Sequence, residues 1–263
     1  MSTEISSISR VGTTEPFELQ IARGQVAWHY PQFKFGFNPD VDDSLETVWA
    51  EGGLYSYIET ATVLKVSSSS TNDTAAGTGA RTVTLFGLDA NYEEIGETVT
   101  LNGQTAVNST KTYLRINRMV VNTAGSGGQN AGVIYAGTGT VTTGVPANKY
   151  ATIAVGDNQT LMALWTVPAD HTAYLLKKDV DVATTQNNKY ATINLVARPF
   201  GGVFQIKDKS VIDSGALNQT YSIPLKFEEK TDLEVRCIGD SAGADIAISA
   251  SLDIIYIRNG DSL

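Results

Sequence analysis

Short apolar runs with a period of two residues recur along this chain, and turn residues separate them about every 8–12 residues. The clearest pair covers 81–88 and 94–101, with a turn at 89–92 between them. No segment sustains the 3.6-residue period of a helix, and 40–50 is where we expect a short one. The pattern predicts a mainly β protein with very little helix, built as a β-sandwich or jelly roll that is either one large unit or two in tandem.

The order of these runs predicts an N-terminal arm over 1–20, a first β domain over 21–145 and a C-terminal β-sandwich over 146–263. A polar loop over 67–79 is of the kind that is functional or mobile, and the Gly/Thr-rich stretch 137–144 could be a linker. The other expected strands are 17–21, 58–66, 113–122, 132–136, 153–155, 160–167, 173–183, 190–198, 203–212, 219–225, 232–238 and 244–257.

The charge balance excludes several partners. Nineteen Lys and Arg against 28 Asp and Glu give a net charge of −9, which argues against a nucleic-acid groove and against adhesion to anionic lipid. The first residues have no apolar core and no run of 18 apolar residues exists, so we expect neither a signal peptide nor a membrane span.

Side chains that carry acid–base or metal chemistry are few. His29 lies among aromatic residues and His171 in a predicted turn, and neither has a second His or Cys at ligand spacing. The single cysteine, Cys237, lies in an alternating run and is expected to be a small buried hydrophobe. The acidic loop 40–43 lacks the glycine and the distal glutamate of an EF-hand. We therefore expect no catalytic residue, metal or cofactor, and a protein that is not an enzyme.

The segment 24–60 has an unusual density of aromatic residues between glycines. It could be core, or a surface that is buried only on assembly. We take it as a docking segment, and we expect Trp28, Phe33, Phe35 and Trp49 to be buried against protein in the assembled state. The candidate interface residues are Trp28, Tyr30, Phe33, Phe35, Phe37, Trp49, Tyr55 and Tyr57.

Three stretches resemble a family of structural proteins from tailed bacteriophages, notably those of marine and aquatic bacteria. They are 21–26 with 35–41, 46–49 with 52–55, and 77–83 through 87–92 to 97–103. The resemblance covers about 20–200 and continues more loosely to the end. It implies a virion component that is assembled in the host cytoplasm, and it carries over no functional residue.

Three places in a particle fit this description. The first is a capsid decoration or cement protein, a homotrimer that binds the major capsid protein or other virion proteins, with its negative charge on the outer face of the shell. The second is a receptor-binding module of a tail or head fibre, for which the aromatic residues of 28–57 would recognise the host surface. The third is a tail or neck component.

Overall fold

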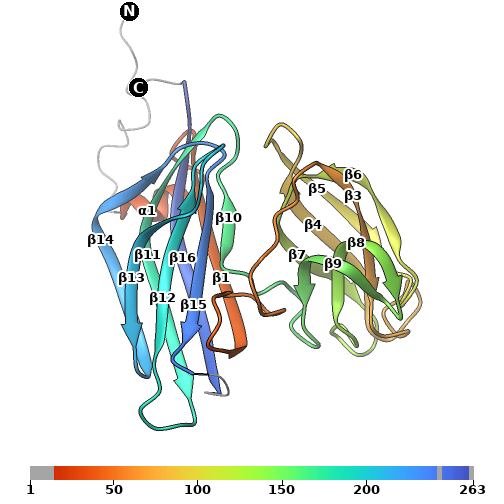
Figure 1. The fold of residues 1–263 in the computed structure, drawn as a ribbon. Coiled ribbons are helices and arrows are strands. Elements are labelled where there is room, and N and C mark those ends of the chain that lie inside the picture. Colours follow the sequence, from red (N-terminus) through yellow and green to blue (C-terminus); the bar gives the residue numbers. More distant parts are fainter. Residues whose placement is uncertain (1–14, 242–244, 261–263) are drawn as a thin grey trace, which may run out of the picture.

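The computed structural model describes residues 15–241 and 245–260, and within them the chain is mainly antiparallel β-structure with one short helix (Figure 1). The expected fold class, mainly β with very little helix, is confirmed. The elements are α1 (Phe17–Ala22), β1 (His29–Val41), β2 (Glu46–Thr47), β3 (Thr62–Ser68), β4 (Ala80–Leu88), β5 (Glu94–Thr100), β6 (Val107–Tyr113), β7 (Arg115–Ala124), β8 (Ile134–Thr142), β9 (Val145–Ile153), β10 (Leu164–Thr166), β11 (His171–Thr184), β12 (Ala191–Arg198), β13 (Gln205–Ile212), β14 (Gly215–Phe227), β15 (Asp232–Gly239) and β16 (Ile246–Arg258).

The strands form two units, each made of two sheets (Figure 1). In the first, which we call the discontinuous unit, the order β1-β16-β11-β14 faces the order β10-β15-β12-β13, and β2 pairs with β15. In the second, the inserted unit, β6-β3-β8-β9 faces β5-β4-β7. The inserted unit therefore lies between β2 and β10 in the chain.

Alternating side chains build a separate core in each unit. Along β16, every second residue from Ile246 to Leu252 is buried while the residues that alternate with them are partly exposed. The buried residues join a core to which both sheets of the discontinuous unit contribute. Leu64 and Leu85 lie in the corresponding core of the inserted unit. Burial of each such side chain stabilises the fold by roughly 1.5–3 kcal/mol.

We expected a domain boundary between residues 145 and 146, but the sheets divide the chain elsewhere. β1 pairs along its length with β16, so 29–41 belongs with the C-terminal strands. β9 begins at Val145 and pairs with β8, so it belongs to the inserted unit. Strand spacing reports local elements, whereas these pairings join distant parts of the chain, which is why the order of the runs misplaced the boundary.

Three local predictions were wrong. The expected strand 17–21 is α1, whose first turn forms when the amides of Leu19 and Gln20 donate to the carbonyl of Pro16. The expected helix at 40–50 contains the short strand β2. The expected linker 137–144 is part of the β8–β9 hairpin, because Thr143 and Gly144 take the positive φ angles of 49° and 80° that a two-residue hairpin turn needs.

The polar loop after β3 is held by one buried carboxylate. Asp73 accepts hydrogen bonds from the amides of Ala80 (2.7 Å), Ala131 (2.9 Å) and Gly132 (2.9 Å) and from the Ser68 hydroxyl (2.6 Å). These bonds fix the loop to β3, to the start of β4 and to the segment before β8.

Of the expected arm 1–20, residues 1–14 lie outside the described part, and 17–20 are helical. In the part of the chain that the structure describes, no helix is long and apolar enough to span a membrane.

Candidate functional site

Three phenylalanines lie on the outer face of β1, the edge strand of its sheet. Phe33 is 56% exposed and Phe37 36%, and the rings of Phe33 and Phe35 stack with their centroids 5.5 Å apart. We call Phe33, Phe35 and Phe37 the phenylalanine row. The intervening residues Lys34 and Gly36 are buried, so β1 reverses the usual pattern and puts its large apolar side chains toward solvent.

Gly36 explains part of this reversal. A Cβ at this position would lie 2.2 Å from the amide nitrogen of Ala163 and 2.3 Å from the carbonyl oxygen of Val48. At Gly36 the inner face of β1 thus approaches other backbone too closely for a side chain, so at this point of the strand only the outer face carries large side chains.

Polar groups border the row. Phe35 lies opposite Ser251 and Phe37 opposite Ser249 on β16, and Asp179 and Asp181 follow on β11. A hollow of about 270 Å³ lies between these side chains and the row. Exposed rings with a polar border are typical of a surface that another molecule covers.

Trp28 and Tyr30 lie at the N-terminal end of the same strand. Trp28 is 45% exposed, and the guanidinium of Arg258 lies 5.2 Å from its ring centroid. Tyr30 is 37% exposed and packs on Tyr256, with ring centroids 5.2 Å apart. With the phenylalanine row, five of the eight predicted interface residues therefore lie along or next to β1.

The other three lie in the connection from β2 to β3. Trp49 and Tyr55 are only 5% and 6% exposed and pack with Met162, while Tyr57 packs against this cluster. The Tyr55 hydroxyl donates to the main-chain oxygen of Tyr150 at 3.0 Å. Trp49 and Tyr55 are thus buried inside this chain, at the junction of its two units, and offer no surface to another molecule.

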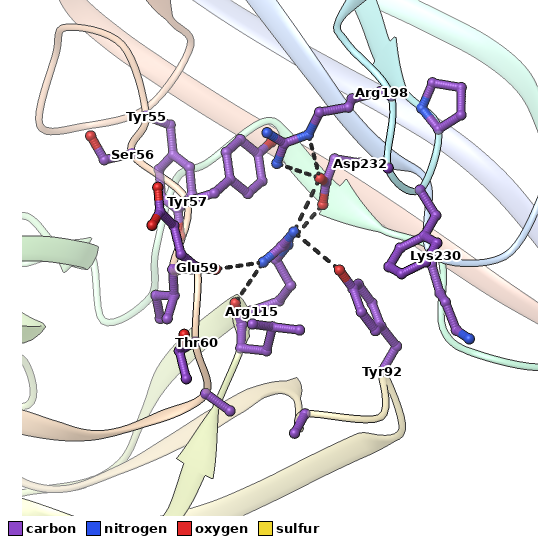
Figure 2. Close-up of a pocket in the computed structure, with 18 of the residues that line it drawn as sticks. Tyr55, Ser56, Tyr57, Glu59, Thr60, Tyr92, Arg115, Arg198, Lys230 and Asp232 are labelled. Atoms are coloured by element: carbon purple, nitrogen blue, oxygen red, sulfur yellow. Dashed lines mark hydrogen bonds and ion pairs between the residues drawn. The ribbon is translucent and has the colours of Figure 1, made fainter.

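A cleft of about 920 Å³ lies at this junction (Figure 2). The discontinuous unit lines it with Arg198, Lys230 and Asp232, and the inserted unit lines it with Tyr92 and Arg115. The connection 55–61 forms a further part of its wall.

Asp232 lies at the centre of this cleft and is 2% exposed (Figure 2). It accepts two hydrogen bonds from Arg115 (2.8 and 3.2 Å), two from Arg198 (2.9 and 2.6 Å) and one from the Thr166 hydroxyl (2.6 Å). Burial opposes the charge of Arg115, but the hydrogen bonds and the charge of Asp232 raise its pKa. Because Arg115 comes from β7 and Asp232 from β15, this ion pair joins the two units.

Aromatic rings stack on these guanidinium groups. The Tyr57 ring lies 4.9 Å from the guanidinium of Arg115 and 4.5 Å from that of Arg198. Burial, and then the charge of Glu234, raise the pKa of Tyr57 well above its usual value. Tyr57 therefore keeps its proton at neutral pH. The aromatic rings and charged groups that line the cleft could hold and orient a ligand.

A separate ring at the cleft remains available to a ligand. Phe200 is 67% exposed at the rim, with the ammonium of Lys230 at 5.5 Å from its ring centroid.

Cys237, His29 and His171, the other residues considered in the sequence analysis, are in contact with protein atoms that account for their positions. Cys237 is buried, as expected, and burial raises the pKa of its thiol. His29 and His171 each contact a main-chain oxygen two residues earlier, at 2.8 and 2.7 Å. Over residues 15–241 and 245–260, no group of three or more His, Cys, Asp or Glu could hold a metal ion.

Sequence reasoning missed the charged residues of the junction. Arg115 stands between Leu114 and Ile116, and Lys34 between Phe33 and Phe35. A charge inside an apolar run was the available signal, because such a charge needs a buried partner. No feature of the sequence indicated that Asp232 is the partner of Arg115.

No protein-family model and no curated protein matches this chain. Among solved structures, it is similar to the VP2 subviral particle of infectious bursal disease virus, with 14% identity over 89% of this chain and 73% of that chain and a TM-score of 0.24. It is also similar to the structure of the Gx strain of that virus, with 10% identity over 89% and 73% and a TM-score of 0.25. TM-scores this low do not define a common fold, so these likenesses carry no argument about function.

Proposed function

We propose that this chain is a non-enzymatic structural component of a tailed-phage particle, a capsid decoration protein that docks through the phenylalanine row. The observation that carries the proposal is the reversal of β1, which exposes Phe33 and Phe37 while Lys34 is buried. The resemblance of its sequence to tailed-phage structural proteins supports the virion as its location. We further propose that each pair of facing sheets is a β-sandwich.

Physical arguments favour docking in many copies. Covering the row with apolar surface gains roughly 1.5–3 kcal/mol per ring, and the loss of translational and rotational freedom on association offsets much of the sum, so a single row binds weakly. Closed symmetry, with the homotrimer as our proposed state, would present several rows at once and raise the avidity. The partners would be further copies of this chain and the major capsid protein or another virion protein. A net charge of −9 suits a position on the outside of the shell, away from DNA.

The second candidate function is a receptor-binding module on a tail or head fibre, and the junction cleft is what favours it. Its exposed ring, Phe200, and the ammonium of Lys230 could contact a glycan or a protein of the host surface. A tail or neck component remains a third possibility on the resemblance alone.

Copy number separates the first two candidates. We expect purified virions to contain on the order of hundreds of copies of this chain, because a decoration protein repeats with the lattice of the shell. Quantitative gel densitometry against the major capsid protein measures the ratio. A value of a few dozen copies or fewer would favour the fibre candidate and exclude decoration.

The phenylalanine row is tested by substitution. We expect the variant Phe33→Ser/Phe35→Ser/Phe37→Ser to lose at least about tenfold in affinity for particles that lack this protein, because three rings can no longer be buried. Co-sedimentation of the purified full chain with such particles measures the affinity. Because all three side chains lie on the outer face of β1, the variant should keep the β-sheet circular dichroism of the parent.

Phe200→Ser is the matched control, since Phe200 is also an exposed phenylalanine but lies in the cleft. A decoration protein with this change should sediment with particles as the parent does. If Phe200→Ser lost binding and the triple variant kept it, the docking surface would be the cleft and the proposal would be wrong.

A further inference from the structure

We propose that a second cavity, next to Lys34, binds a tetrahedral oxyanion that carries a proton, with inorganic phosphate as the simplest example. This cavity has a volume of about 420 Å³. Its walls include Gln32 and Lys34 from β1, Asn117 and Arg118 from β7, and Trp165 from β10. Both units therefore contribute to it, and it is separate from the cleft around Asp232.

Lys34 supplies a buried positive charge without a negative partner. Its side chain leaves β1 on the buried face of the strand, opposite the phenylalanine row, and the residue is 5% exposed. The ammonium donates to the main-chain oxygen of Asn117, which is an uncharged acceptor. Within residues 15–241 and 245–260, no carboxylate lies within ion-pair distance of it. A buried ammonium in this situation is stabilised by any anion that can reach it.

The charged groups around the cavity favour an anion. Arg118 is a second cation, and its charge adds to the effect of burial in lowering the pKa of Lys34 to about 7. One nitrogen of the Arg118 guanidinium donates to the Gln159 side chain at 2.7 Å, which leaves other N–H groups for a ligand. Glu94 is the one carboxylate of the lining, and it accepts a hydrogen bond from the Tyr256 hydroxyl at 3.3 Å.

Asn117 adds a requirement for a donor. Its side-chain oxygen is buried and has no hydrogen-bond partner. An unpaired buried acceptor is costly, so a ligand that offers an O–H group here would be favoured over one that does not. Near neutral pH phosphate offers both acceptor oxygens for Lys34 and Arg118 and an O–H donor for Asn117. Sulfate has the same shape but carries no proton.

The experiment is isothermal titration of the full chain with sodium phosphate or sodium sulfate, in chloride buffer at constant ionic strength and about pH 6.5. We expect phosphate to bind at one site and about tenfold more tightly than sulfate, the equivalent of one buried hydrogen bond. Failure of phosphate to bind, or equal affinity for the two anions, would overturn the proposal.

Variants assign the site. Arg118 is exposed, so Arg118→Gln should leave the fold intact while weakening phosphate binding about tenfold. Lys34→Met should abolish binding, and Asn117→Ala should remove the preference for phosphate over sulfate. Lys207→Met, which removes an exposed lysine on β13, is the control and should bind phosphate as the parent does. Unchanged phosphate affinity in both Arg118→Gln and Lys34→Met would place the anion elsewhere and refute the inference.

Discussion

Replacing Asp232 with alanine is expected to lower the free energy of unfolding by about 3–5 kcal/mol. The change removes the common acceptor of Arg115 and Arg198 and leaves the first of these guanidinium groups buried, with a side chain only 8% exposed. It also removes the partner of the Thr166 hydroxyl. Urea denaturation followed by tryptophan fluorescence measures the loss.

Two comparisons test the cause. Asp232→Asn keeps an acceptor oxygen but not the charge, so its loss of stability should lie between those of the alanine variant and the parent. Asp213 is an exposed carboxylate in a turn, and Asp213→Ala should change stability by no more than about 0.5 kcal/mol. If Asp232→Ala were as mild as Asp213→Ala, the charge network would contribute little to holding the two units together.

Replacing Lys34 with methionine is expected to stabilise the protein, by roughly 2–4 kcal/mol at about pH 6 in phosphate-free buffer. Methionine has similar length and leaves no buried charge. In the unfolded chain Lys34 has its ordinary pKa of 10.5, whereas burial and the charge of Arg118 lower it to about 7 in the fold. Below pH 7 both states hold the proton, and the folded state bears the full cost of a buried charge.

Between pH 7 and 10.5 only the unfolded state binds this proton, so the stability of the parent rises with pH. The advantage of Lys34→Met should accordingly shrink as the pH approaches about 10. Chemical denaturation of parent and variant across this range measures the difference, with Lys207→Met as the control for loss of an exposed charge. A gain that did not depend on pH, or a loss at pH 6, would contradict the surroundings described for Lys34.

The strands were predictable because their signal is local. The β4–β5 hairpin was expected at 81–88 and 94–101 and is found at Ala80–Leu88 and Glu94–Thr100, since alternation and turn residues specify both strands within one stretch. The pairing of β1 with β16 had no such signal, because the residues that meet are at opposite ends of the chain. The short run 17–21 was misread because a period of two and a single helical turn are indistinguishable over so few residues.

For the candidate sites, too, local features were predictable and long-range contacts were not. The aromatic residues of 24–60 could be singled out by composition, but not which of them would face outward. That depends on Gly36, whose close backbone contacts set the inner face of β1. Arg115 and Asp232 come together only through the packing of one unit on the other, so no spacing in the sequence joins them.

The position of the inserted unit has a consequence for synthesis. As the ribosome releases the chain from its N-terminus, β1 emerges early, while β16, the strand that pairs with it, emerges last. The inserted unit contains all the strands of its own two sheets and can fold while translation continues. Until β16 arrives, the nascent chain holds β1 without its partner strand, so the backbone groups that pair with β16 in the fold are unpaired. We therefore expect that a messenger RNA truncated before β16 yields an aggregating product, and that folding of the discontinuous unit follows the synthesis of β16.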